Sequence, residues 1–149
     1  MGTNMQPIYI ASGWFNEEQR CDLFTIEYML TCFDLPFFSP SKEAICPAIS
    51  DPAERNKVFG ANLQAIDDAE YVIVNTRDKD LGTIFEAGVA YAWAKKIIYC
   101  AFGLKGQFNL MLAQSGCRVC TSFSDLQVVL EELARTGTLE DKQYTGSIE

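Results

Sequence analysis

Three consecutive segments of the chain decide its fold: Tyr71-Val-Ile-Val74, Asp80-Leu-Gly-Thr-Ile-Phe-Glu86-Ala-Gly-Val-Ala-Tyr-Ala92 and Lys96-Ile-Ile-Tyr-Cys-Ala101. The first and third are short apolar runs rich in β-branched and aromatic residues, a composition typical of buried strands. The middle segment is long enough for several helical turns and consists largely of apolar and small residues. A helix between two buried strands indicates a parallel βαβ unit, because parallel strands need a long crossover connection.

The same alternation of strands and helices extends along the rest of the chain. We expect further strands at residues 7–11, 35–38 and 117–121, and further helices at residues 17–31, 51–68, 108–115 and 124–135. Asn16 and Asp51-Pro52 are helix-start signals, whereas residues 39–50 contain two prolines without a regular period and predict a loop. The pattern predicts an α/β fold with a doubly wound parallel sheet of five strands in the flavodoxin-like order 2-1-3-4-5 and helices on both faces.

Composition limits the class of protein. The 149 residues are 48% hydrophobic, which suits one domain, residues 1–149, with its own core. The net charge of −8 opposes the neutralisation of phosphates, so a nucleic-acid polymer is not an expected partner. Residues 1–6 do not show the cationic segment and apolar run of a signal peptide, and no apolar stretch is long enough to span a membrane. Gly2 is not an expected myristoylation site, because Gln6 stands where that motif has serine or threonine. We expect a cytoplasmic protein without a membrane partner.

Six cysteines and the absence of histidine restrict the chemistry. Cys117-Arg-Val-Cys120 has the CxxC spacing, but there is no second CxxC, and side chains three residues apart in a strand point to opposite faces. We therefore expect no metal site and interpret the cysteines as buried, reduced thiols. Without histidine, proton transfer falls to carboxylates, tyrosines, lysines or cysteines.

The predicted topology indicates where a ligand would bind. In open parallel sheets, ligands bind beyond the carboxyl ends of the strands, near the point where the strand order reverses. This rule selects three loops, at residues 12–15, 75–82 and 102–109. The first loop lacks the G-x-G-x-x-G fingerprint, so no dinucleotide cofactor is expected. The second loop ends beside Asp80 and Glu86, and paired carboxylates at a pocket edge are typical of glycosyl chemistry.

Glu86 is a carboxylate in an otherwise apolar helix, an unusual place for a charged side chain unless it has a function or faces solvent. Gly82 lies one turn earlier on nearly the same side and leaves room for a ligand. The nearby helix N-terminus favours an ionised, nucleophilic Glu86, although a helix-surface glutamate near a favourable dipole end would have the same sequence. Asp80 could bind a ligand, or it could be an ordinary helix cap.

Other residues near these loops also allow two readings. Tyr9, Trp14 and Phe15 could form an aromatic wall for a planar ligand, although a tyrosine in a buried strand is commonly part of the core. Asn62 stands in the middle of a predicted helix, where asparagine is a poor helix former. It could therefore face a pocket, but a solvent-facing asparagine would look the same.

Four segments together resemble the nucleoside 2-deoxyribosyltransferase family. Residues 8–15, Ile-Tyr-Ile-Ala-Ser-Gly-Trp-Phe, are similar to the family's first strand and loop, and residues 80–91 are similar to its catalytic segment. Phe108-Asn109-Leu110-Met111 resembles the late substrate loop, and residues 144–149 resemble the C-terminal tail. These segments occur in the family's order across nearly the whole chain.

The resemblance implies a ping-pong exchange of 2-deoxyribose between nucleobases without a metal or cofactor. Glu86 would form a covalent ester with the sugar, Asp80 would bind the base and help move its proton, and Tyr9 would orient Glu86. Substrate-binding positions would be Gly13, Trp14, Phe15, Asn62, Gly82, Asn109 and Met111. The family also implies a homo-oligomer, typically a hexamer built from dimers, in which a neighbour's Asn109, Met111 and tail complete the sugar site.

Two further readings remain open. The same scaffold and nucleophile could hydrolyse deoxynucleosides or deoxynucleoside monophosphates, with water accepting the sugar. The first loop offers a single Ser12 before Trp14, which suits a free 5'-hydroxyl better than a 5'-phosphate. The third reading is a nucleotide-binding module without catalysis. The Ser39–Ser50 loop does not show the glutamine that some family members use to bind the base, so base preference stays undefined.

Overall fold

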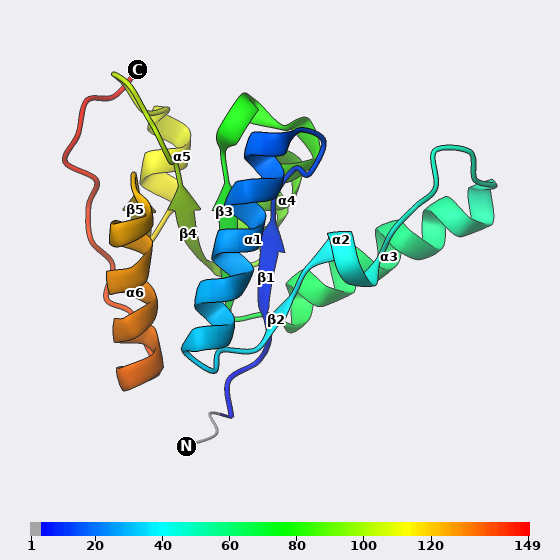
Figure 1. Ribbon diagram of the computed structural model, residues 1–149, viewed down its shortest axis with the longest axis horizontal. Coiled ribbons are helices and arrows are strands. Elements are labelled where there is room, and N and C mark those ends of the chain that lie inside the picture. Colours follow the sequence, from blue (N-terminus) through cyan, green and yellow to red (C-terminus); the bar gives the residue numbers. More distant parts are fainter. Residues whose placement is uncertain (1–3) are drawn as a thin grey trace.

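The structure is a computed structural model that describes residues 4–149. The expectation that Gly2 is not myristoylated concerns residues outside that range. The elements are β1 (Ile8–Ala11), α1 (Glu17–Cys32), β2 (Phe37–Phe38), α2 (Pro40–Glu43), α3 (Pro52–Asp68), β3 (Tyr71–Asn75), the 3-10 turn η1 (Arg77–Lys79), α4 (Leu81–Ala92), β4 (Lys96–Cys100), α5 (Leu110–Ser115), β5 (Arg118–Cys120) and α6 (Phe123–Thr136) (Figure 1).

One parallel sheet organises the fold. Its strand order is β2-β1-β3-β4-β5, which confirms the predicted topology. The register places Ile73 of β3 beside Ile10 of β1 and Ile98 of β4, at the centre of the sheet. The connection after β1 leads to β2 on one side of β1, and the connection after β2 returns to β3 on the other side. The strand order therefore reverses between β1 and β3. The carboxyl ends of these two strands therefore border the crevice where a ligand is expected.

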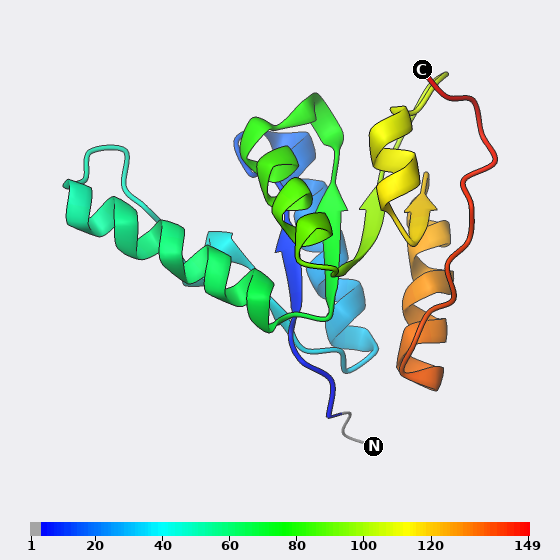
Figure 2. The same cartoon turned by 180° about the vertical axis from the view of Figure 1, so that it is seen from behind.

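Helices cover both faces of the sheet. Alternate strand residues point to opposite faces, so Ile8 and Ile10 join one core while Tyr9 and Ala11 join the other. The first core contains buried residues of α1 and α6, and the second contains residues of α3, α4 and α5. The two opposite views show α1 and α6 on one side of the sheet and α4 and α5 on the other (Figures 1 and 2).

Local signals explain where the helices begin and end. Asn16, Asp51 and Ser122 each accept a hydrogen bond from a backbone N–H in the first turn of α1, α3 and α6. Gly137 ends α6 in the left-handed region with φ 78°. The predicted loop at residues 39–50 is partly wrong, because Pro40 starts the short helix α2, a position where proline is well tolerated.

The cysteines divide into two groups. Cys100, Cys117 and Cys120 are buried free thiols, and burial raises the pKa of Cys117 to about 11 and that of Cys120 to about 12. The expectation of burial is wrong for Cys21, Cys32 and Cys46, which are exposed. Cys117 and Cys120 belong to the same core cluster rather than to opposite faces, because Cys117 precedes β5 and does not follow the strand alternation. None of the helices within residues 4–149 is long and apolar enough to cross a membrane.

Candidate active site

The carboxyl ends of β1 and β3 border a cavity of about 410 Å³. Its walls come from the loop after β1, from the first half of α4 and from α3. The lining residues are Ser12, Trp14, Phe15, Pro40, Phe59, Asn62, Leu63, Asp80, Gly82, Thr83, Phe85 and Glu86. The loops after β1 and β3 line the cavity as predicted. The loop after β4 does not line it, and residues of α3 do so instead.

Glu86 lies in the second turn of α4, and the buried Tyr9 of β1 holds it. The Tyr9 hydroxyl donates a hydrogen bond to Oε2 of Glu86. Tyr9 itself is fully buried, and its ring stacks on Phe38 of β2 with centroids 5.8 Å apart. The core interpretation of Tyr9 is therefore correct, whereas its ring does not line the cavity and forms no aromatic wall; its hydroxyl nevertheless reaches the Glu86 carboxylate.

Burial raises the pKa of Glu86 to about 7. The hydrogen bond from Tyr9 opposes this rise, and the negative charge of Asp80 adds to it. The sequence-based expectation of a readily ionised Glu86 is wrong, because loss of solvation outweighs the stabilisation expected from the helix N-terminus. At a pKa of about 7, roughly half of the Glu86 carboxyl groups are ionised at neutral pH. Burial and the charge of Glu86 also raise the pKa of Tyr9, which keeps its hydroxyl a donor.

Asp80 is both a helix cap and a cavity residue. Its Oδ2 accepts hydrogen bonds from the backbone N–H of Thr83 at 3.0 Å and from the Thr83 hydroxyl at 2.8 Å. The capping reading is therefore correct for one oxygen. Among residues 4–149, no group donates a hydrogen bond to Oδ1, which leaves that oxygen for a ligand.

The two candidate glycines have different positions. Gly82 lines the cavity, and a side chain there would first meet Asp80 Oδ2 at 3.6 Å, so its surroundings are open. Gly13 is buried and does not line the cavity; a Cβ atom there would lie 2.8 Å from the side chain of Gln19. Because Gln19 accepts a hydrogen bond from Phe15 N–H, Gly13 allows the loop to close against α1.

Aromatic rings surround the cavity. Trp14 and Phe15 contribute rings 5.3 Å apart from the loop after β1. Phe59 of α3 and Phe85 of α4 form a second pair, 6.2 Å apart, and about half of each residue is exposed. The sequence reasoning missed this second pair. The available signal was Phe59 in the polar segment Arg-Asn-Lys-Val-Phe-Gly-Ala-Asn, where an aromatic residue has no core to join.

Asn62 lines the cavity beside these rings. Its Oδ1 is buried and accepts no hydrogen bond from any residue that the structure describes. Such an atom costs about 1–3 kcal/mol unless a partner satisfies it. An N–H group of a bound ligand would supply that partner.

Asn109 and Met111 do not reach this cavity within one chain. They line another cavity of about 480 Å³, together with the C-terminal Glu149. Asn109 caps α5 by accepting the N–H of Leu112 at 3.2 Å, and Met111 is 75% exposed. The tail runs beside them, because Phe108 and Ile148 form a β-bridge.

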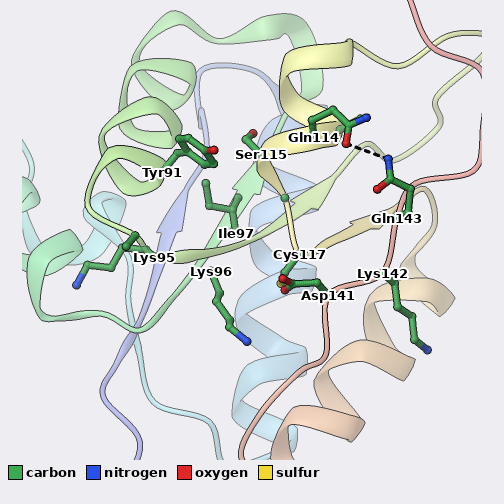
Figure 3. A pocket seen from close by; sticks show the side chains of 13 residues that line it. Tyr91, Lys95, Lys96, Ile97, Gln114, Ser115, Cys117, Asp141, Lys142 and Gln143 are labelled. Atoms are coloured by element: carbon green, nitrogen blue, oxygen red, sulfur yellow. Dashed lines mark hydrogen bonds between the residues drawn. The ribbon is translucent and has the colours of Figure 1, made fainter.

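A third cavity, of about 500 Å³, lies between α4, α5 and the segment before the tail (Figure 3). Figure 3 shows the side chains of Lys95, Lys96 and Lys142 extending in different directions rather than converging on one point. The carboxylate pair thus favours the cavity at Glu86 as the candidate active site.

The family profile described as nucleoside 2-deoxyribosyltransferase matches residues 8–121, which include Tyr9, Asp80 and Glu86. This chain belongs to the nucleoside 2-deoxyribosyltransferase family. The match covers residues 8–15, 80–91 and 108–111 and confirms the resemblance to the family, while residues 144–149 lie outside it. A comparison with curated proteins finds no significant match.

Solved structures agree with membership in the deoxyribosyltransferase family. A 2-deoxyribosyltransferase from Bacillus psychrosaccharolyticus is 25% identical, with a TM-score of 0.74 over 93% of this chain and 99% of that one. A CMP N-glycosidase from Clostridium botulinum shares the fold at 15% identity, with a TM-score of 0.55 over 85% and 99%. A Leishmania mexicana 2-deoxyribosyltransferase shares it at 19% identity, with a TM-score of 0.51 over 73% and 71%.

Proposed function

We propose that this chain exchanges 2-deoxyribose between nucleobases through a covalent intermediate on Glu86, as a cytoplasmic enzyme of nucleobase salvage. The observation that carries the proposal is the half-buried Glu86, held by Tyr9 and facing the same cavity as Asp80. Family membership supports the substrate class, which is 2'-deoxynucleosides and free bases. The chemistry of a carboxylate pair supports the reaction type.

The first half-reaction breaks the bond between the sugar and the base. Tyr9 occupies Oε2 of Glu86, so Oε1 is the oxygen available to attack the anomeric carbon. As the new C–O bond forms, the C–N bond breaks and its electron pair goes to the base nitrogen. Asp80 enters this step protonated on its open Oδ1 and delivers that proton to the departing base, becoming the carboxylate that accepts a proton in the second half-reaction.

The second half-reaction reverses these steps with another base. A nitrogen of the incoming base attacks the anomeric carbon and displaces the Glu86 carboxylate, while Asp80 takes the proton from the base. Two displacements at one carbon give net retention of configuration. The aromatic pairs at Trp14 and Phe59 bracket a planar base, and Asn62 Oδ1 accepts one of its N–H groups.

The lining of the cavity favours a nucleoside over a nucleoside monophosphate. None of the described lining residues is a lysine or an arginine, so a 5'-phosphate would meet no cation. The Ser12 hydroxyl already donates to the Gly13 carbonyl at 2.9 Å and accepts from Asn75 at 3.2 Å. A free 5'-hydroxyl fits this environment better.

An exchange assay tests the proposed function. The protein is incubated with 2'-deoxyinosine and free adenine or cytosine, and new deoxynucleosides are followed by chromatography, with inosine as the ribonucleoside control. Formation of 2'-deoxyadenosine or 2'-deoxycytidine supports the transferase. Free hypoxanthine and deoxyribose as the only products would instead identify a hydrolase. Binding without turnover, unchanged in Glu86→Ala, would identify a binding module.

Tyr9→Phe should move the acid side of the pH profile upward. The Tyr9 hydrogen bond lowers the pKa of Glu86, so its removal raises that pKa and reduces the ionised fraction at a given acidic pH. We expect kcat/KM at pH 6 to fall by roughly tenfold, because hydrogen bonds to charged groups are worth about 1.5–3 kcal/mol. The measurement is kcat/KM against pH from 5 to 9. A profile that moves to lower pH would contradict this role of Tyr9.

The same proposal includes a homo-oligomer, typically a hexamer built from dimers, with shared active sites. Asn109 and Met111 lie outside the Glu86 cavity of their own chain. Met111 and Leu81, which line the same cavity as Asn109, are exposed apolar residues. A neighbouring copy that packs this exposed surface against the cavity would bring its Asn109 to the sugar. The tail that pairs with Phe108 would arrive with it.

Mixing two inactive variants tests whether sites are shared. Glu86→Gln and Asn109→Ala are each expected to be poorly active, because each removes one half of every site. After the subunits are unfolded and refolded together in equal amounts, about a quarter of the sites should combine an intact Glu86 with a partner's intact Asn109. Recovery of about that share of wild-type exchange supports shared sites. No recovery, with mixed oligomers confirmed by mass, would contradict them.

A further inference from the structure

An ion pair between Arg77 and the buried Asp22 lies behind the turn that carries Asp80. Asp22 of α1 is only 1% exposed. Arg77, the first residue of η1, donates from Nη2 to Asp22 Oδ1 at 3.1 Å and from Nε to Asp22 Oδ2. Its third nitrogen, Nη1, donates to Glu18 at 2.7 Å. Neither Asp22 nor Arg77 lines the cavity, so a direct contact with substrate does not explain them.

The ion pair connects the two loops that build the cavity. Asn75, at the end of β3, donates to Asp22 at 3.3 Å and to Ser12 at 3.2 Å. Its side-chain oxygen accepts the backbone N–H of Arg77 at 3.2 Å. On the outer side, Asn16 donates to Asp78 at 2.7 Å. Through these bonds α1 ties the loop after β1 to the turn after β3.

The turn itself needs support from outside. Asp78 and Lys79 have φ values of 62° and 52°, in the left-handed region. Non-glycine residues adopt this conformation in succession only when surrounding contacts impose it. Asp80 follows directly and starts α4, so the direction of its carboxylate depends on this turn.

We propose that Asp22 and Arg77 are positioning residues that hold the turn and thereby aim Asp80 at the leaving base. The proposal rests on the proposed function, in which Asp80 protonates that base. Glu86 is held separately, by α4 and by Tyr9 of β1. Loss of the ion pair should therefore impair proton transfer to the base and leave the attack on the sugar largely intact.

A pair of substrates separates these two steps. 2'-Deoxyinosine needs a proton on its departing base, whereas the N7-methylated form of the same nucleoside releases a neutral base without one. With 2'-deoxyinosine, Arg77→Met should lower kcat by about 10-fold to 100-fold, part of the usual contribution of a general acid, with little change in KM. With the methylated substrate the loss should stay under about threefold. Arg77→Lys should recover part of the activity, because lysine keeps the charge but not the bidentate geometry.

A matched control is available at the edge strand β5. Arg118 of β5 is 6% exposed and donates to Glu132 at 2.6 Å and to the carbonyl of Glu140 at 2.9 Å. Arg118→Met removes a guanidinium that is more deeply buried than that of Arg77 and lies outside the cavity lining. It should affect both substrates equally. Equal losses on both substrates in Arg77→Met would overturn the proposal, because they would indicate general destabilisation.

Hydrogen exchange tests the same pair without relying on activity. Amides of residues 76–83 should exchange at least about tenfold faster in Arg77→Met and in the milder Asp22→Asn than in wild type, while Arg118→Met leaves them unchanged. Unchanged exchange in both variants would overturn the proposal. If the wild-type protein transferred no deoxyribose between bases, the proposed function would be refuted instead. Amide hydrogen exchange alone would then show whether Asp22 and Arg77 stabilise the turn.

Discussion

Replacing Glu86 with glutamine is expected to reduce deoxyribosyl exchange by roughly 10⁴-fold to 10⁶-fold, the range found when a covalent nucleophile is removed. The amide cannot form the sugar ester, while its oxygen still accepts the Tyr9 hydrogen bond and preserves the local geometry. The assay follows 2'-deoxyadenosine formed from 2'-deoxyinosine and adenine. Glu86→Asp should also be strongly impaired, because a shorter side chain cannot keep both Tyr9 and the anomeric carbon in reach. Unchanged exchange in Glu86→Gln would remove the assigned nucleophile.

The free energy of unfolding of Glu86→Gln, compared with that of wild type, should change with pH in one direction and provides a control. The pKa of Glu86 is about 7 in the folded state and ordinarily 4.5, so the folded chain binds this proton more tightly than the unfolded chain. Its contribution to stability is present below pH 4.5 and is lost as the pH rises through 7, a change of about 3 kcal/mol. Glutamine does not ionise, so Glu86→Gln should gain stability relative to wild type from pH 4.5 to pH 8. Urea unfolding at both pH values measures this difference; a constant difference would contradict the raised pKa.

The strand order could be predicted because the signals that determine it are local. The apolar runs at residues 71–74 and 96–101 and the helix between them identify a βαβ unit without any knowledge of distant contacts. The helix boundaries follow from capping residues such as Asn16 and Gly137. Since right-handed crossovers restrict how such units can join, the order 2-1-3-4-5 follows from few alternatives.

The properties of the candidate site depend on distant contacts and were harder to predict. The pKa of Glu86 is set by burial among residues of β1, α3 and α4, so reasoning from its own helix gave the wrong direction. Phe59 and Phe85 meet only because α3 crosses beside α4. The Asp22–Arg77 ion pair joins residues 55 positions apart and left no pattern in the sequence.

The family resemblance and the single chain also differ in an informative way. Sequence similarity groups Asn109 and Met111 with the substrate site, whereas within one chain they line a separate cavity. The C-terminal tail lies with them, held to Phe108. The proposed homo-oligomer with shared sites would reconcile these facts, because a neighbouring copy would supply the residues that lie apart within one chain.

Asp80→Asn is the second large effect that we expect, a reduction of about 10²-fold to 10⁴-fold in exchange from 2'-deoxyinosine. Asparagine caps a helix as well as aspartate does, so the start of α4 and the position of Glu86 should be preserved. The loss should shrink with the N7-methylated substrate, whose base leaves without a proton. In the free protein the negative charge of Asp80 raises the pKa of Glu86, so with the N7-methylated substrate, which needs no proton from Asp80, its removal should also move the acid side of the pH profile to lower pH.

A second capping aspartate separates catalysis from helix capping. Asp51 accepts the N–H of Glu54 at 2.8 Å at the start of α3, but it does not line the cavity. Asp51→Asn should therefore leave exchange and its pH profile unchanged. If Asp80→Asn and Asp51→Asn behaved alike, Asp80 would be a cap alone, and the proton would have to reach the base from another group. A loss confined to Asp80→Asn and dependent on the leaving base would mean that one carboxylate performs both tasks, with Oδ2 fixing the helix and Oδ1 serving the base.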